Sequence, residues 1–302
     1  MIQFINTILI GITSGAIYSL MALSIVIIWR SSRVINFAQA GLALFSTYVG
    51  YECVKVIGNY WIALPIAVIA GALIASMIEF LFMRFLAKLH INSPISAVAP
   101  IIVTLGLLGI IRASIAFIWG GQELRIAAPL SNIGYSIGDK TLVFSPMKLM
   151  ILISVVIVLV ILGIIFQRTN LGLALKASSF APEISKLSGL KVDLIRNIGW
   201  ALSDGVAALA GLLQTANGSG SISPEALEFA ILLVSGFIAA VIGGLESLIG
   251  AVFGGLLLGT LVSFALMYID GGLFFIAPLF ILILVLIVRP RGLFAPKAGR
   301  HA

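Results

Sequence analysis

Three polar side chains stand within or beside long apolar runs, where each needs either a structural partner or a role in transport. Asp204 is the eighth residue of the apolar stretch 197–216, and Asn36 and Gln39 open the stretch 36–54. An ionisable group at membrane depth costs a few kcal/mol unless it is paired or wet. Asp204 could therefore line a solute pathway, hydrogen-bond a broken helix, or hold a proton. Asn36 and Gln39 could satisfy the backbone of a kinked or re-entrant helix, or face the same pathway.

Groups that make or break covalent bonds are sparse in this sequence. His90 and His301 lie far apart, without the spacing of metal ligands, and Cys53 is the only cysteine. We find neither a Gly-rich phosphate loop of the Walker type nor a nucleophile–base pattern. The sequence therefore predicts a chain that is not an enzyme, holds no metal and binds no cofactor of its own.

The composition is that of a membrane protein. Of 302 residues, 61% are hydrophobic and 10% are charged, and the mean hydropathy is +1.22. A soluble domain has about 25% charged residues, so this chain needs a lipid bilayer around it. The apolar runs are long and do not alternate, which favours helices over barrel strands. The net charge of +7 comes from cations between these runs, so it does not indicate nucleic acid.

We expect an all-α polytopic protein with one transmembrane domain over residues 1–302. It should have about nine helices, eight to ten, of roughly 20 apolar residues each. The predicted spans are 4–29, 36–54, 61–83, 95–118, 146–166, 197–216, 228–243, 249–269 and 273–288. The second span has polar residues near its start and the seventh is short, so either could be broken or re-entrant.

The distribution of cations predicts the orientation. With the N-terminus outside and the C-terminus in the cytoplasm, 13 of the 18 Lys and Arg residues fall in inner segments. Only 4 then fall in outer segments, and Arg112 lies within a span. Cytoplasmic loops carry an excess of Lys and Arg. This orientation is therefore favoured, and it places residues 167–196 in the cytoplasm.

An inverted repeat is possible, because spans 1–4 and 6–9 would cross the membrane in opposite senses. The stretch "ALPIAVIAGALIASMIEF" of span 3 loosely resembles "LIGAVFGGLLLGTLVSFA" of span 8 in its small residues. Apolar helices also resemble one another by chance. Both a repeat and a chance similarity stay open.

A basic and polar segment, residues 167–196, interrupts the apolar sequence with five cations. Its pattern predicts two short helices, one over about 171–178 and one with Pro182 in its first turn and Gly189 as its stop. The apolar side chains of this pair are Leu171, Leu175, Ile184 and Leu187. Membrane headgroups or a docked protein would cover them, unless the segment is an interfacial amphipathic loop without a partner.

This segment resembles the cytoplasmic coupling segment of ABC importer permeases, in particular those of the branched-chain amino acid uptake family. There the segment has a Gly, a basic residue followed by Ala, a small or acidic cluster, and a second Gly. In "NLGLALKASSFAPEISKLSGL" these positions are Gly172, Lys176, Ala177, Glu183 and Gly189. The resemblance implies a short helix that sits in a groove of an ATPase subunit and transmits its closure.

The resemblance covers nearly the whole chain. The stretch "GITSGAIYSLMALSIVIIWRSSRVINFAQAG" is similar to the family's first span and following turn, with "INFA" its most specific part. "SDGVAALAGLL", "VIGGLESLIGAVFGGLLLG" and the ending "RPRGLF" follow in the family's order. The sequence departs from the family at Ala40 and Gly41, where Gly and an acidic residue are usual, and at Ser185, where Ala is common.

The family resemblance implies a permease subunit that moves branched-chain amino acids or a similar small polar solute across a bacterial or archaeal inner membrane. ATP would be used by two partner ATPase subunits, a homologous permease or a second copy would pair with the chain, and a solute-binding protein would dock outside. Relatives of this family also carry urea and short amides, so the solute stays open. The alternatives are an ion-coupled secondary transporter, in which Asp204 would be the coupling group, a passive urea-like channel, and a membrane-embedded enzyme.

Small residues recur at four-residue spacing in two spans. The pairs are Gly250–Gly254 and Gly255–Gly259 in the eighth span and Gly11–Gly15 in the first. Glycines at this spacing let helix backbones approach closely in a membrane. We therefore expect these faces to pack against other helices, either inside the chain or against a second permease.

Overall fold

The protein is described here by a computed structural model, which covers residues 2–88, 95–137, 140–289 and 292–293. The two histidines and part of the "RPRGLF" ending lie outside these residues. The described chain is almost entirely helical. Its helices are α1 (Ile2–Ser32), α2 (Gln39–Ile57), α3 (Tyr60–Ile78), the π-helix η1 (Glu79–Met83), α4 (Arg84–Lys88), α5 (Ile95–Trp119), α6 (Pro146–Arg168), α7 (Asn170–Phe180), α8 (Pro182–Leu187), α9 (Val192–Asn217), α10 (Leu227–Gly243), α11 (Leu248–Tyr268), the 3₁₀-helix η2 (Gly271–Phe274) and α12 (Ile276–Val288).

The expected all-α polytopic membrane fold is confirmed. Within the described residues, five stretches are long and apolar enough to cross a membrane: α1, α3 with its continuation, most of α5, α6 and α11. Helices α10 and α12 are equally apolar but have 17 and 13 residues. Helices α2 and α9 are long but more polar, and much of each is buried in the bundle. The count of nine spans stays a prediction.

Several helix ends differ from the predicted spans, and polar residues are the reason. Helix α9 begins at Val192 rather than at 197, because Asp193 and Arg196 occupy its first turns and lower its hydropathy. The third helix turns into the π-helix η1 at Glu79, which a hydropathy pattern cannot detect. Helix α2 begins at Gln39, after an unwound stretch.

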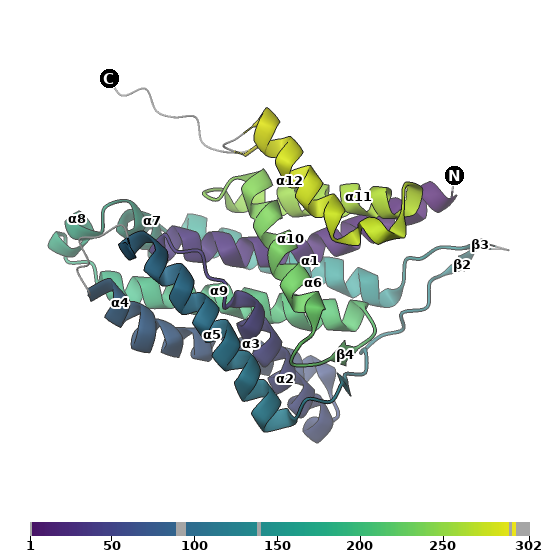
Figure 1. The fold of residues 1–302 in the computed structure, drawn as a ribbon, viewed down its shortest axis with the longest axis horizontal. Coiled ribbons are helices and arrows are strands. Elements are labelled where there is room, and N and C mark those ends of the chain that lie inside the picture. The colour runs from purple at the N-terminus through teal and green to yellow at the C-terminus, as the bar shows by residue number, and fades with distance from the viewer. Residues whose placement is uncertain (1, 89–94, 138–139, 290–291, 294–302) are drawn as a thin grey trace.

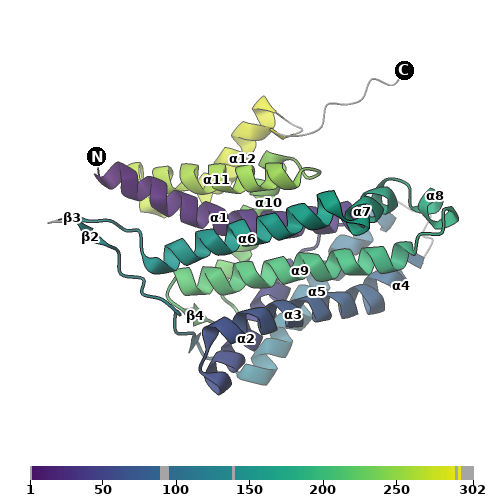
Figure 2. The same cartoon turned by 180° about the vertical axis from the view of Figure 1, so that it is seen from behind.

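Helix α1 is the centre of the molecule. Nearly every residue from Gly15 to Ile28 is buried, including polar Ser19 and Ser24. The helix is apolar on all sides, as a helix enclosed by other helices should be. It packs against α11, α9 and α10, which surround it in Figures 1 and 2. The core of the protein therefore follows α1 along most of its length.

The contacts between helices form the same pattern in two sets of four. Helices α1, α2, α3 and α5 of the first set correspond to α9, α10, α11 and α12 of the second. Helix α1 packs on α11, and α9 packs on α3. Helix α2 packs on α3 and α5, and α10 packs on α11 and α12. Helix α1 also contacts α10 as α9 contacts α2. The two sets are the first four and the last four predicted spans, so this pattern supports the repeat that the sequence leaves open.

The two ends of the bundle are built differently. Helices α7 and α8 project at one end, while the N-terminus and the short strands β2 (Ser136–Ile137) and β3 (Lys140–Thr141) lie towards the other (Figures 1 and 2). A second strand pair joins β1 (Leu124–Arg125) to β4 (Ser221–Ile222) in antiparallel register. The connection before α6 is thus tied to the connection before α10, and both belong to the predicted outer side.

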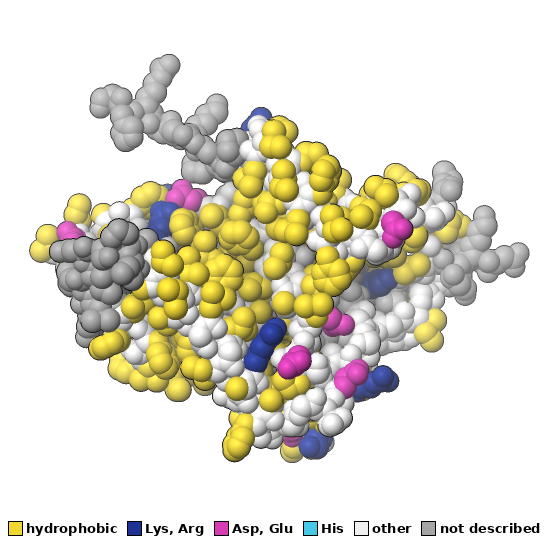
Figure 3. All heavy atoms as spheres, viewed as in Figure 1, with side chains coloured by type: hydrophobic (Ala, Val, Ile, Leu, Met, Phe, Trp, Pro, Cys, Tyr) yellow, Lys and Arg dark blue, Asp and Glu magenta, His cyan; other side chains and the backbone are white. Residues whose placement is uncertain are grey.

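The surface carries many exposed apolar side chains. Hydrophobic side chains cover most of the central part of the face shown in Figure 3, and charged side chains are few there. Over the molecule as a whole, exposed apolar side chains include Leu73 of α3, Phe117 of α5, Val156 of α6 and Ile287 of α12. Such an extensive apolar surface has to face lipid or a partner chain.

Candidate functional site

The connection between α1 and α2 is unwound at residues 33–38. Arg33 has a φ of 55°, in the left-handed region that costs an L-residue about 1–2 kcal/mol. The Asn36 side chain then accepts a hydrogen bond from the backbone N–H of Ala38 at 3.0 Å. This local turn replaces a helical hydrogen bond and lets α2 start in a new direction. The polar residue at 36 therefore shapes the break, and Gln39 is the first helical residue after it.

The amide of Gln39 is the centre of a buried polar network. Its Nε2 donates to Ser24 Oγ at 2.6 Å and lies 3.2 Å from Ser203 Oγ and 3.3 Å from Asp204 Oδ1. Its Oε1 accepts a hydrogen bond from Asn36 Nδ2 at 3.0 Å. The Ser203 hydroxyl also donates to the Ser24 carbonyl at 2.7 Å. One side chain thus connects α1, α2, α9 and the unwound connection.

The carboxyl of Asp204 is only half satisfied. Its Oδ2 has no hydrogen-bond partner within the described part of the chain. This oxygen lies towards α3, where a Cβ added to Gly71 would meet it at 3.2 Å and Ser46 Oγ at 2.6 Å. A bare carboxylate oxygen in a closed interior is costly, so the position favours a proton or a polar group that approaches from α2 and α3.

The network is closed in this structure. The side chains of Gln39, Ser203 and Asp204 are 0% exposed, and Asn36 is 4% exposed. The three residues singled out from the sequence, Asn36, Gln39 and Asp204, are therefore brought together by the fold. In this conformation they join helices and line no open passage.

A second buried polar site was not singled out from the sequence. Glu79, the first residue of η1, is fully buried, and its Oε1 accepts a hydrogen bond from Arg196 Nε at 2.6 Å. Its Oε2 accepts from Asn197 Nδ2 at 2.9 Å, and Asn197 exchanges two further hydrogen bonds with Ser76. The charge of Arg196 is also 3.4 Å from Asp193. A π-helical turn often marks a functional position in a helix, and here it carries the carboxylate that binds the start of α9.

A signal for this pair was present in the sequence. Glu79 lies near the predicted inner end of span 3, and Arg196 lies just before span 6, on the same side of the membrane. A single charged side chain near the end of a span can extend to the interface, so neither residue on its own indicates a buried pair. Pairing opposite charges on the same side would have connected them.

Residues 167–196, the segment predicted to couple to an ATPase and called the coupling segment below, contain α7 and α8, which project at one end of the bundle (Figure 1). Gly172 is buried, and a Cβ there would overlap the backbone of Phe166, so a glycine is needed where α7 turns away from α6. Lys176 and Glu183 are exposed, and Ala177 is half-buried. Gly189 has a φ of 83° and ends α8, with Leu190 N–H donating to the Ser185 carbonyl at 3.0 Å. This is a Schellman end, which favours glycine.

The exposed apolar face of the segment differs in part from the predicted one. Phe180, Ile184 and Leu187 are 65%, 66% and 90% exposed. Leu175 was expected on this face, yet it is only 1% exposed. Its side chain lies 3.3 Å from where a Cβ on Gly199 would be, so it packs against α9. One residue thus anchors α7 to the bundle while the face beyond it stays uncovered.

Arg33 joins the unwound connection to the coupling segment. Its guanidinium pairs with Glu246 at 2.7 Å and lies over the Phe180 ring, 5.2 Å from the centroid. Glu246 belongs to the connection between α10 and α11, and Phe180 is the last residue of α7. The end of α1 therefore contacts two other parts of the same surface.

The glycines of α11 face neighbouring helices of this chain. A Cβ on Gly254 would overlap the carbonyl of Ala239 in α10, and Gly250 approaches Gly243 in the same helix. Gly255 and Gly259 face α1 instead, where Cβ atoms would collide with Ser19 and with the backbone of Gly15. The hydroxyl of Ser19 donates to the Val252 carbonyl at 2.9 Å across this interface. Gly11 of α1 packs against the backbone of Thr260 in α11, which a Cβ at position 11 would overlap.

The sequence profile of a family described as "Branched-chain amino acid transport system / permease component" matches residues 7–288. The chain belongs to this family. The match includes α1, the coupling segment and α12, so every site described above lies within it. The protein is accordingly a non-catalytic transport subunit and a multi-pass protein of a bacterial or archaeal inner membrane.

Named relatives cover almost the whole chain. The chain is 28% identical, over 287 residues, to a probable branched-chain amino acid transport permease protein LivH of Methanocaldococcus jannaschii, covering 91% of this chain and 87% of the relative. It is 24% identical over 300 residues to the high-affinity LivH permease protein of Salmonella typhimurium, covering 97% and 96%. A shorter match, 29% over 175 residues, covers 53% of this chain and 46% of the fructose import permease protein FrcC of Rhizobium meliloti.

Proposed function

We propose that this chain is the membrane permease of an ABC importer for branched-chain amino acids, driven by ATPase subunits that bind the coupling segment. The main support is the family match over residues 7–288, together with full-length relatives named as branched-chain amino acid permeases. An ion-coupled carrier, a passive channel and an embedded enzyme are less favoured, because family members act as permease components of transport systems.

The observation that carries the coupling proposal is the uncovered helix pair α7–α8. Ile184 and Leu187 lie on a short helix that projects from the bundle with Glu183 and Lys186 beside them. A small apolar patch with charges around it is typical of a protein-docking surface. We assign the role of ATPase coupling to Gly172, Lys176, Ala177, Glu183 and Gly189, as the family pattern implies.

Closure of the ATPase subunits would reach the transmembrane helices by three routes. Gly172 fixes the corner between α7 and α6, and Leu175 packs on α9 beside Gly199. The ring of Phe180 contacts Arg33, which is the first residue of the break before α2. A movement of α7 would therefore act on α9 and on the α1–α2 connection, which are the two sides of the Gln39 network. We propose that opening this network accompanies the change of access.

Two further partners are expected, a second permease subunit and a solute-binding protein. A homologous permease or a second copy would cover part of the exposed apolar surface and complete the transport pathway. A solute-binding protein would dock on the predicted outer side, near the β1–β4 pair that ties the two outer connections together. ATP would be bound by the ATPase subunits alone.

The test is co-purification from membranes with the partner subunits, followed by uptake in proteoliposomes. The double variant Ile184→Asp, Leu187→Asp should lose the ATPase and ATP-driven leucine uptake, because it charges the exposed face without opening the core. The matched control is Ile133→Asp, an 81% exposed residue at the opposite end, which should keep the ATPase. A double variant that binds the ATPase and transports normally contradicts the coupling assignment.

The substrate and the energy source are tested in the same vesicles. We expect leucine uptake that needs ATP and the solute-binding protein, with fructose and urea excluded. Uptake driven by a proton or sodium gradient without ATP would support an ion-coupled carrier instead. Energy-independent urea flux would support a channel.

A further inference from the structure

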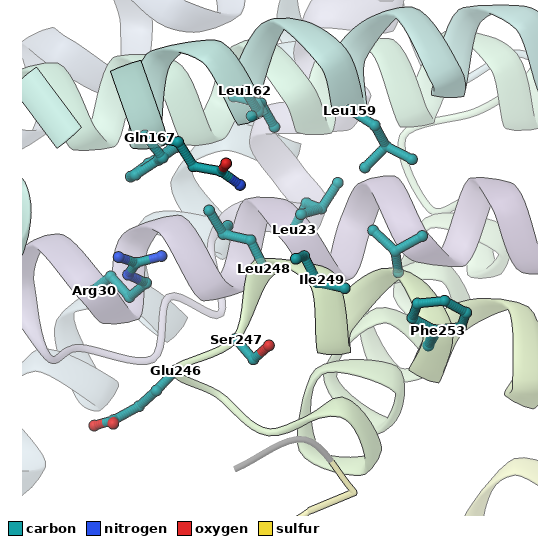
Figure 4. Close-up of a pocket in the computed structure, with 13 residues that line it drawn as sticks. Leu23, Arg30, Leu159, Leu162, Gln167, Glu246, Ser247, Leu248, Ile249 and Phe253 are labelled. Carbon is teal, nitrogen blue, oxygen red and sulfur yellow. The ribbon is translucent and has the colours of Figure 1, made fainter. Parts of the chain in front are cut away.

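A groove of about 550 Å³ opens between α1, α6 and α11, away from the Gln39 network. In Figure 4, α1 forms its floor, and side chains of α6 and α11 point into it from both sides. Its walls are mostly apolar, formed by Leu23, Leu159, Leu162, Leu248, Ile249 and Phe253. Ile249 and Phe253 are more than half exposed, so the groove is open to the lipid side of the bundle.

The polar groups of the groove gather at one end. Arg30 and Gln167 lie together at the end nearer to α7, whereas Leu159 and Phe253 lie towards the opposite end (Figure 4). The guanidinium of Arg30 stacks over the ring of Phe166, 5.1 Å from its centroid, which holds it at this position. The groove is therefore amphipathic along its length, with a cation at the predicted cytoplasmic level and hydrocarbon-like walls deeper in the membrane.

A second hollow of about 380 Å³ continues from this polar end. It shares Arg30, Glu246 and Ser247 with the groove and adds Arg33, Lys176 and Phe180. Three cations thus surround one carboxylate. Glu246 is engaged by Arg33 at 2.7 Å, while Arg30 and Lys176 form no ion pair within the described part of the chain. The charge of Glu246 also attracts Arg30, so one carboxylate faces three cations and the hollow keeps an excess of positive charge.

We propose that this groove binds one anionic phospholipid of the cytoplasmic leaflet. The phosphate would lie at Arg30 and Lys176, and an acyl chain would follow the walls formed by α6 and α11. Charge complementarity selects the headgroup, since basic pockets between helices on the cytoplasmic side bind anionic lipids.

This binding would place a lipid in contact with the coupling segment. Lys176 and Phe180 belong to α7, and Arg33 belongs to the connection that leads to α2. The headgroup would neutralise the cations that otherwise repel one another at the junction of α1, α7 and the α10–α11 connection. An anionic lipid should therefore stabilise this junction.

Gly163 offers a way to block the groove without damaging the fold. It lines the groove on α6, and a Cβ added there meets no atom within 4 Å. Leucine at this position would fill the acyl channel, and it is also a better helix former than glycine. Gly109 on α5 provides the control, because a Cβ there also meets nothing within 4 Å and the residue is outside the groove.

The experiment is native mass spectrometry of the purified chain in detergent with equal amounts of phosphatidylglycerol and phosphatidylcholine. The wild type should retain one phosphatidylglycerol in preference. Arg30→Gln should lower this preference about fivefold, which corresponds to ~1 kcal/mol for one lost cation–headgroup contact. Gly163→Leu should lose the bound lipid of either kind, and Gly109→Leu should behave as the wild type.

Two results would overturn the proposal. One is phosphatidylglycerol retention that neither Arg30→Gln nor Gly163→Leu changes, which would place the lipid elsewhere. The other is a dimer that Gly163→Leu dissociates while lipid binding stays the same, which would make the groove an interface between copies. Neither measurement uses transport, so the outcome is independent of the importer proposal.

Discussion

At the scale of single residues, the buried amide of Gln39 explains why an acidic residue can remain inside this bundle. It offers two N–H donors to three oxygen acceptors, and Asp204 Oδ1 is one of them at 3.3 Å. The other oxygen of Asp204 has no partner in the described chain. Removing a partner from such a network leaves buried polar groups unsatisfied, whereas removing the charge does not.

Gln39→Leu should therefore lower the free energy of unfolding by about 1–3 kcal/mol, because it leaves Ser24, Ser203 and Asp204 without their shared donor. Asp204→Asn should destabilise less than Gln39→Leu, since its side-chain oxygen still accepts from Gln39 and the shared donor of the network stays in place. Thermal unfolding in detergent, followed by tryptophan fluorescence, measures both. Trp200 is fully buried on the same helix as Asp204 and reports on this region.

The control for this comparison is Gln167→Leu, the same change at an exposed position, which should shift stability by less than about 0.5 kcal/mol. If Asp204→Asn destabilises as much as Gln39→Leu, the carboxylate has a partner that this conformation does not include. If Asp204→Asn is stable but transports nothing, the carboxyl serves the transport cycle.

The sequence was informative about which residues matter here and less so about their partners. Asn36, Gln39 and Asp204 were found because polar groups in apolar runs are costly. Their meeting could not be predicted, since it depends on α1 and α9 lying side by side although 179 positions separate Ser24 from Ser203. Ser24 and Ser203 themselves resemble ordinary small residues of a transmembrane helix.

At the scale of elements, the Glu79–Arg196 pair connects η1 to the start of α9, where the coupling segment ends. Glu79 is fully enclosed, and the Arg196 side chain is 16% exposed. A movement transmitted through α8 would reach α9 within a turn of this pair. The pair is therefore positioned to transfer that movement to the third helix.

Arg196→Gln should destabilise the protein by about 3 kcal/mol, because it leaves the Glu79 carboxylate buried without its counter-charge. The double variant Glu79→Gln, Arg196→Gln should recover part of this loss, since both charges are removed. Thermal unfolding of the single and double variants gives the coupling energy. Equal, additive losses would contradict a direct interaction.

The exposed pair Arg33–Glu246 serves as the comparison for this prediction. Its side chains are 34% and 40% exposed, so Glu246→Gln should cost less than about 1 kcal/mol of stability.

Buried polar partners also decide where some helices begin and end. Apolar runs predicted where α1, α6 and α11 lie, but the polar first turns of α9 and the π-turn at Glu79 follow from buried partners that no run of apolar residues records.

At the scale of the whole molecule, the repeated packing relates the first four spans to the last four. Helices α1 and α9 are the two long members, with 31 and 26 residues, and each is largely buried. Glycines permit close contact in both halves: Gly255 and Gly259 of α11 face α1, and Gly71 of α3 faces α2 and α9. If the halves are a repeat, a faint sequence similarity is enough, because only the small contact positions need to match.

If the two halves are inverted, the N-terminus and the coupling segment must lie on opposite sides of the membrane. Replacing Cys53, the only cysteine, with Ser allows single cysteines to report on each side. Leu187→Cys, at a position 90% exposed on α8, should react with a membrane-impermeant maleimide only after permeabilisation. Ile133→Cys, at a position 81% exposed in the connection before α6, should react in spheroplasts, which keep the inner membrane intact. Labelling of both positions in intact spheroplasts would mean that an even number of crossings separates them, which contradicts the inversion. Labelling of Leu187→Cys alone would reverse the predicted orientation.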